Sequence, residues 1–273
     1  MKQRLIVAGV GIPVLLLILL AAPVWATAAM CALLSAVGCY ELMHAVGKDE
    51  WKLLCLMPLF AAWMCTSIGL GEEWTPEPGL YMAAACFVAV VYTIARAVVT
   101  HGRERSLSFR TAMAGLFAMS AIAAGFACLV ILRDISPAVV LTPFIGAFMS
   151  DTGAFFAGRA FGKRKLCPAV SPNKTVAGCI GGFVGSIAGM AVFHLVVKTW
   201  FQLDLGWGVV ILMGVIGSLF GQLGDLSFSV IKREFGIKDY GAIFPGHGGV
   251  LDRFDSVLFV APAYLLFMLL YFA

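Results

Sequence analysis

The chain has 273 residues, of which 61% are hydrophobic and only 12% are charged, and its formal net charge is +4. Such a composition excludes an ordinary soluble domain, in which about a quarter of the residues are charged. The small positive charge is explained by membrane topology, so it gives no reason to expect a nucleic-acid partner.

Apolar runs of about 17 to 25 residues are long enough to cross a bilayer as helices. Only Ala21, Ala22 and Pro23 separate the first two runs. Lys2 and Arg4 before an apolar core are also typical of a signal peptide within residues 1–25, but the apolar run that follows at once favours a retained hairpin. We predict an all-α integral membrane protein with about nine transmembrane helices, at residues 5–21, 23–40, 52–70, 79–98, 111–132, 137–158, 176–197, 207–231 and 251–272.

The basic residues predict the orientation of these helices by the positive-inside rule. With a cytoplasmic N-terminus, 17 of the 19 lysine and arginine residues face the cytoplasm, and only Arg133 and Lys198 do not. The outside loop 71–78 carries Glu72, Glu73 and Glu77 and no basic residue. We therefore expect an odd number of helices, an external C-terminus and a multi-pass protein of the inner (cytoplasmic) membrane.

Polar residues are distributed unevenly along the chain. Residues 1–110 carry little chemistry and are predicted to form a helical scaffold, whereas residues 140–255 carry nearly all the unusual polar residues. We therefore predict a catalytic region over 111–273, with its signature at 229–255. The eight cysteines mostly lie in apolar segments without paired spacing. They indicate buried small side chains, and we expect neither a disulfide framework nor a zinc site.

The first polar cluster lies at the end of the sixth apolar segment and contains Asp151 and Arg159. An ionised carboxylate inside an apolar helix costs several kcal/mol unless a cation or metal meets it. Arg159 lies about two turns later, broadly on the same side of the helix. The pair is either a structural ion pair at a helix end or part of a substrate site, and the segment by itself favours neither.

The second cluster is Ser171-Pro-Asn-Lys-Thr175. Ser171 followed by a proline is typical of a helix start, with the serine hydroxyl as the cap. Lys174 is unexpected there because the helix N-terminus disfavours a cation, unless an anion such as a phosphate shares the site. The following segment has glycines every three or four residues, which we interpret as a face for close helix packing. These are Gly178, Gly182, Gly185 and Gly189.

The third cluster begins on the eighth apolar segment. Four glycines at similar spacing, Gly214, Gly217, Gly221 and Gly224, leave one helix face as bare backbone that another helix or a ligand can approach. Asp225, Ser229 and Lys232 continue much the same stripe. The alternative is a packed interface that contains one Asp–Lys pair.

The loop after this helix is rich in glycine and charge. Pro245-Gly-His-Gly-Gly249 can turn tightly and present successive backbone N–H groups to an anion. Asp252 and Asp255 flank Arg253 at the start of the ninth segment, where acidic residues either cap the helix or bind a hard cation such as Mg²⁺. Zinc is not expected, since His247 is the only histidine near the cluster.

These segments together resemble the phosphatidate cytidylyltransferase (CDP-diacylglycerol synthase) family. The matching pattern is Ser-x-x-Lys-Arg, Lys-Asp-x-Gly, Pro-Gly-His-Gly-Gly and Asp-Arg-x-Asp, in that order. An Asp-Thr-Gly-Ala segment at Asp151 matches as well. The four parts of the longer pattern are, in this sequence, Ser229, Lys232 and Arg233; Lys238, Asp239 and Gly241; Pro245 to Gly249; and Asp252, Arg253 and Asp255.

The resemblance implies that CTP and phosphatidate react to give CDP-diacylglycerol and pyrophosphate at the bilayer surface. We predict that Asp225 and Asp252 bind a catalytic metal, and the resemblance supports this pair, with Mg²⁺ and a second cation, K⁺. It also suggests a homodimer. The substrate phosphates would contact four basic side chains, Lys174, Lys232, Arg233 and Arg253. Asp239 and Asp255 would orient these basic side chains or bind metal, and His247, Gly248 and Gly249 would hold nucleotide phosphate. The rest of the substrate site would consist of Asp151, Arg159, Ser171, Thr175, Ser229 and Lys238.

Two positions depart from the family pattern, because Ala177 and Phe228 stand where relatives commonly carry glutamate. Three alternatives therefore remain open. The enzyme could use another lipid phosphate, such as an ether-linked or polyprenyl one, or it could be a catalytically silent member. A membrane transporter is the third, although the charged residues gather on one side and no inverted repeat is visible.

Overall fold

The computed structural model describes residues 2–47, 49–69, 78–103, 106–201, 205–244, 246 and 248–272. It is helical apart from one short hairpin, so the all-α prediction is confirmed in its main feature. The chain divides into two compact units, residues 1–137 with 235–254, and residues 138–234 with 255–273. Lys48, Arg105 and the glutamates of the 71–78 loop, which the predicted orientation uses, lie outside the described residues.

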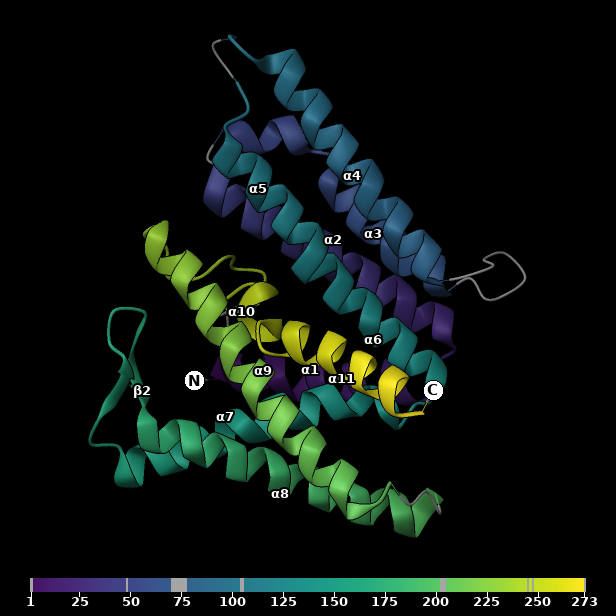
Figure 1. The fold of residues 1–273 in the computed structure, drawn as a ribbon, viewed down its shortest axis with the longest axis vertical. Coiled ribbons are helices and arrows are strands. Elements are labelled where there is room, and N and C mark those ends of the chain that lie inside the picture. The colour runs from purple at the N-terminus through teal and green to yellow at the C-terminus, as the bar shows by residue number, and fades with distance from the viewer. Residues whose placement is uncertain are drawn as a thin grey trace. The chain divides into compact units, whose positions relative to one another are not determined.

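The first unit is a bundle of apolar helices. In Figure 1, α2, α3, α4 and the continuous α5–α6 rod run side by side. The predicted boundary between the first two segments is confirmed, since α1 ends at Leu20 and α2 begins at Val24. The elements are α1 (Lys2–Leu20), α2 (Val24–Gly47), η1 (Glu50–Leu54), α3 (Met57–Gly69), α4 (Pro78–Thr100), α5 (Phe109–Phe117), a π-helical turn η2 (Ala118–Ala123), α6 (Ala124–Ile135) and α10 (Leu251–Phe254).

A partly buried carboxylate contact fixes the start of α5 in this unit. Ser108 caps the helix by accepting from the Thr111 N–H, and Glu50 accepts from the Ser108 N–H at 2.9 Å. The hydroxyls of Ser108 and Thr111 donate to the same carboxylate oxygen, at 2.6 and 2.8 Å. Partial burial raises the pKa of Glu50, but these hydrogen bonds to its charged form outweigh burial and lower it overall. Glu50 therefore has a structural role.

The second unit is built on the pair α7 and α8, with the hairpin β1–β2 projecting from one end (Figure 1). Its two strands are antiparallel, with Cys167 opposite Ser171 and Lys165 opposite Thr175. The elements are η3 (Val139–Leu141), α7 (Thr142–Phe161), β1 (Lys165–Cys167), β2 (Ser171–Thr175), α8 (Val176–Phe201), α9 (Trp207–Glu234) and α11 (Val257–Phe272).

Glycine allows the backbones of α7 and α8 to touch. A Cβ at Gly153 in α7 would overlap the carbonyl oxygen of Gly181 and lie 2.9 Å from the Cα of Gly185, both in α8. The backbones of α7 and α9 are also close, because a Cβ at Gly217 in α9 would lie 3.0 Å from the Cα of Gly146 in α7. The close packing predicted for both glycine series is therefore confirmed.

Six helices among the described residues are long and apolar enough to cross a membrane. Shorter apolar helices occupy 11–20, 57–69 and 257–271, within three further predicted segments. The ninth predicted segment, 251–272, is interrupted at Asp255 and Ser256, which separate α10 from α11. Of the eight cysteines, all of which are free, Cys31, Cys39, Cys65 and Cys128 are buried as predicted, whereas Cys55 is exposed. The chain is thus a multi-pass membrane protein.

Candidate functional site

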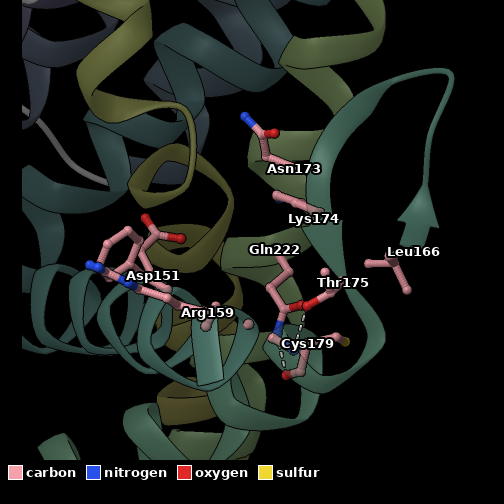
Figure 2. A pocket seen from close by; sticks show the side chains of 12 residues that line it. Asp151, Arg159, Leu166, Asn173, Lys174, Thr175, Cys179 and Gln222 are labelled. Carbon is pink, nitrogen blue, oxygen red and sulfur yellow. Dashed lines mark hydrogen bonds between the residues drawn. The ribbon is translucent and has the colours of Figure 1, made fainter. Parts of the chain in front are cut away.

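A cavity of about 610 Å³ opens in the second unit between α7, α8, α9 and the hairpin. Asp151 and Arg159 face it from α7, and Lys174 and Thr175 face it from the end of β2 (Figure 2). Among the described residues no ion pair joins Asp151 to Arg159, so the structural pair considered above is absent there. Four predicted substrate-binding residues from two segments thus line one cavity.

An ionic contact between the hairpin and α9 lies beside the cavity. The ammonium nitrogen of Lys174 is 2.5 Å from Oδ2 of Asp225, and both side chains are about three-quarters buried. Ser229, one turn after Asp225 in α9, donates its hydroxyl to Oδ1 at 3.3 Å. Lys174 therefore has a carboxylate partner from another element. Asp225 thus pairs with a lysine of the hairpin, whereas the alternative considered above placed the Asp–Lys pair on the helix itself.

Three carboxylates and two ammonium groups form one electrostatic cluster in this unit. The charges of Asp225 and Lys174 act on Asp151, and those of Asp225, Lys232 and Asp151 act on Asp255. Gly224 lets α9 come close to Asp255, because a Cβ there would lie 2.6 Å from the Asp255 carbonyl oxygen. Three carboxylates, Asp151, Asp225 and Asp255, are thus gathered near two lysines within one unit.

The start of α8 differs from the prediction. Ser171 begins strand β2 instead of capping a helix, and α8 begins at Val176. Thr175 is the cap, since its hydroxyl accepts from the Gly178 N–H at 3.0 Å. A Ser-Pro pair caps a helix only if the residues after it take up helical conformation directly. Here pairing with β1 keeps the backbone extended for five residues, which carries Lys174 to Asp225.

Other predicted residues of this unit lie around the hairpin. Arg233, at the end of α9, donates from Nε to the Val170 carbonyl at 3.1 Å and so holds the hairpin turn. Gln222 and Asn173 also line the cavity, although neither was predicted from the sequence as a site residue. Gln222 donates to the Cys179 carbonyl at 3.2 Å and to the Ser218 hydroxyl at 2.8 Å. An amide within an apolar helix was the signal that could have identified Gln222.

The two positions that depart from the family pattern are apolar in their surroundings. Ala177 lines a groove of about 680 Å³ along α7 and α8, among small and aliphatic side chains and the rings of Phe156 and Phe161. Phe228 is fully buried, and its ring packs edge-on against Phe259. The local packing therefore suits the small Ala177 and the aromatic Phe228 that are present.

The glycine loop belongs to the first unit. Phe244 pairs with Gly248 across a tight turn, and Gly246 and Gly248 have φ of 77° and 87°. Asp252 accepts at Oδ2 from the N–H groups of Tyr240 and Gly249, both at 2.9 Å. The predicted anion-holding loop thus holds a carboxylate of its own chain.

A second carboxylate of the first unit, Glu41 in α2, accepts from the N–H groups that follow this loop, those of Val250 and Leu251. The sequence analysis did not select it. Lys238, Asp239 and Arg253 are exposed, while His247 and Pro245 lie outside the described residues. Of the predicted metal pair, Asp225 belongs to the second unit and Asp252 to the first.

No three His, Cys, Asp or Glu side chains converge to hold a metal ion within the part of the chain that the structure describes. Mg²⁺ needs fewer, because it usually keeps several waters and takes one or two carboxylates together with substrate phosphates. Asp225 already has a cation, the Lys174 ammonium, at Oδ2, so its carboxylate chemistry fits such an ion. Among the described donors, the Asp225 carboxylate therefore fits an Mg²⁺ ion whose other ligands are water and phosphate oxygens.

The sequence is similar to those of known proteins along most of its length. The sequence model of the cytidylyltransferase family matches residues 2–271. The phosphatidate cytidylyltransferase of Staphylococcus haemolyticus is 35% identical over 234 residues, which are 84% of this chain and 85% of that protein. The enzyme of the same name from Staphylococcus aureus is 41% identical over 184 residues, 66% of this chain and 65% of its own length. The chain therefore belongs to the cytidylyltransferase family.

Proposed function

We propose that the protein transfers the cytidylyl group of CTP to phosphatidate, giving CDP-diacylglycerol and pyrophosphate for phospholipid synthesis. The observation that carries this proposal is the identity with phosphatidate cytidylyltransferases along most of both chains. The cavity beside the Lys174–Asp225 pair supports it, because basic and acidic side chains lie together at the end of a pair of apolar helices.

The reaction demands little covalent chemistry of the protein. An oxygen of the phosphatidate phosphate attacks the α-phosphorus of CTP, the bond to the β-phosphate oxygen breaks, and pyrophosphate leaves in line. The nucleophile is already an oxyanion, so no side chain has to become one. The protein has to hold the phosphatidate phosphate, the α-phosphate of CTP and the leaving pyrophosphate in line and to neutralise their negative charge.

Residues around the cavity suit this task. Lys174 would neutralise phosphate charge, with Arg159 and Thr175 beside it. Asp225 and Asp252 stay the predicted ligands of Mg²⁺, which when bound polarises the phosphoryl oxygens and stabilises the leaving pyrophosphate. The Asp225 carboxylate binds the Lys174 ammonium at Oδ2. When Lys174 turns to phosphate, Asp225 keeps its charge for a cation.

Purified protein in detergent, given CTP, Mg²⁺ and phosphatidate, is expected to release pyrophosphate and form CDP-diacylglycerol. Chelating the divalent ion should stop the release, because three anionic groups are then brought together without neutralisation. K⁺ is varied separately to test the second cation. Folded protein that releases no pyrophosphate over a range of cations would refute the proposal, and preferential use of a polyprenyl or ether-linked phosphate would move it to another lipid substrate.

We also propose the finer topology, with nine crossings, a cytoplasmic N-terminus and an external C-terminus in the inner (cytoplasmic) membrane. The distribution of basic residues supports it. Alkaline phosphatase fused after residue 273 should be active, since it works only outside the cytoplasm, and a fluorescent protein in its place should stay dark. The reverse pattern would exclude an odd number of crossings.

A homodimer is likewise a proposal, which light scattering of the detergent-solubilised protein tests.

A further inference from the structure

Glu41 stands alone as a carboxylate in the apolar helix α2. Its side chain belongs to a residue only 3% exposed, where an unpaired charge costs several kcal/mol. The charge is met by two consecutive backbone groups, because the Val250 N–H donates to Oε1 and the Leu251 N–H donates to Oε2, each at 3.0 Å. Both oxygens of the carboxylate therefore hold the segment that leads into α10.

The loop is shaped to receive this carboxylate. A Cβ at Gly241 or at Gly249 would overlap Oε1 of Glu41, so only glycine lets the backbone approach so closely. One turn earlier in α2, a Cβ at Gly38 would lie 3.1 Å from Leu251 Cδ2. The face of α2 that carries Gly38 and Glu41 is thus packed directly against the glycine loop.

The same segment sets the orientation of Asp252. Its Oδ2 is held by the N–H groups of Tyr240 and Gly249, and a Cβ at Gly248 would lie 2.8 Å from that oxygen. Val250 and Leu251, which Glu41 holds, separate Gly249 from Asp252 along the chain. The two carboxylates therefore grip neighbouring N–H groups of one short stretch, and displacement of either changes the backbone that carries the other.

We propose that Glu41 is a positioning residue for Asp252. By fixing residues 249–251, it keeps the Asp252 carboxylate in the orientation needed to bind the cation, without contacting substrate itself. This inference rests on the proposed function, in which Asp252 is a metal ligand. Groups that orient metal ligands typically change metal affinity or activity by about 10- to 100-fold when they are removed.

Glu41→Gln tests the proposal with little change of shape. An amide offers one acceptor oxygen, so one backbone N–H would face an NH₂ group and lose its partner. We expect the Mg²⁺ concentration for half-maximal turnover to rise by about 10- to 100-fold, with turnover partly restored by excess Mg²⁺. Amide hydrogen exchange should accelerate in peptides covering residues 240–252, and the rise in melting temperature caused by Mg²⁺ with CTP should shrink.

Glu50→Gln is the matched control, because Glu50 is also a hydrogen-bonded carboxylate of the first unit and holds Ser108 and Thr111 instead of the loop. It should leave the Mg²⁺ requirement and the exchange of 240–252 unchanged. An equal effect of both variants, or an unchanged Mg²⁺ requirement in Glu41→Gln, would overturn the proposal.

The contact is also tested without any variant. In the wild-type protein, the amides of Val250 and Leu251 should exchange slowly, and exchange as fast as that of an open loop would refute the contact. Because hydrogen exchange needs no turnover, these results stay distinct from a failure of the wild-type enzyme to use CTP or phosphatidate.

Discussion

Asp225→Asn should lower turnover by about 10³-fold or more while the protein remains folded. The asparagine keeps the size of the side chain and an acceptor for the Ser229 hydroxyl, but it removes the charge that Lys174 meets and that a cation would need. Loss of several kcal/mol of charge stabilisation at a phosphoryl-transfer centre gives this factor, since about 1.4 kcal/mol corresponds to tenfold. Steady-state release of pyrophosphate measures it.

Because Asp225 forms an ion pair, Asp225→Asn is expected to lower stability as well as turnover, and a double variant separates these two effects. Asp225→Asn leaves the Lys174 ammonium without its carboxylate, so the melting temperature should fall; Lys174→Met in addition should restore part of it without restoring turnover. Asp134→Asn, the same chemical change at an exposed residue of α6, should alter neither quantity. Turnover within about tenfold of wild type in Asp225→Asn would show that this carboxylate does not carry the reaction.

Gly153→Ala should destabilise the second unit strongly, although it adds one methyl group. That methyl would overlap the Gly181 carbonyl and crowd the Cα of Gly185, and both are backbone atoms of α8 that cannot rotate away. Overpacking of a tight contact costs about 1–3 kcal/mol. We expect the upper end of that range, seen as a lower melting temperature in detergent and a smaller yield of folded protein.

Gly208→Ala is the control for this experiment, because no atom lies within 4 Å of the place where its Cβ would stand. It makes the same change within an apolar helix and should leave the melting temperature unchanged or slightly raised. If Gly153→Ala melted like Gly208→Ala, the backbone contact between α7 and α8 would not exist as described.

Helix positions were largely predictable, because a long apolar run has few ways to satisfy its backbone in a membrane. The boundary at 21–23 and the packing of both glycine series followed from local patterns. The hairpin did not. Ser171-Pro172 is typical of a helix start, and only pairing with Lys165–Cys167 shows that the chain stays extended until Thr175. Pairing of strands depends on another segment, which a local pattern does not contain.

For the site, the sequence identified the residues of the Lys174–Asp225 contact but not the contact itself. The lysine was assigned to a phosphate and the aspartate to a metal, because each was considered within its own segment. Glu41 was missed for a stronger reason. Its partners are backbone N–H groups 209 and 210 residues away, and a backbone group has no identity in the sequence. A lone glutamate in an apolar helix was the available signal.

Because Glu41 and its donors lie far apart in the sequence, their contact can form only late in synthesis. During synthesis, α2 is complete long before Val250 and Leu251 are added to the chain. Until then its carboxylate has to be protonated or hydrated at the bilayer surface, and the helix inserts with that penalty uncompensated. Chains that stop short of residue 250 would lack both donors, so their Glu41 would never gain the hydrogen bonds that it has in the finished protein.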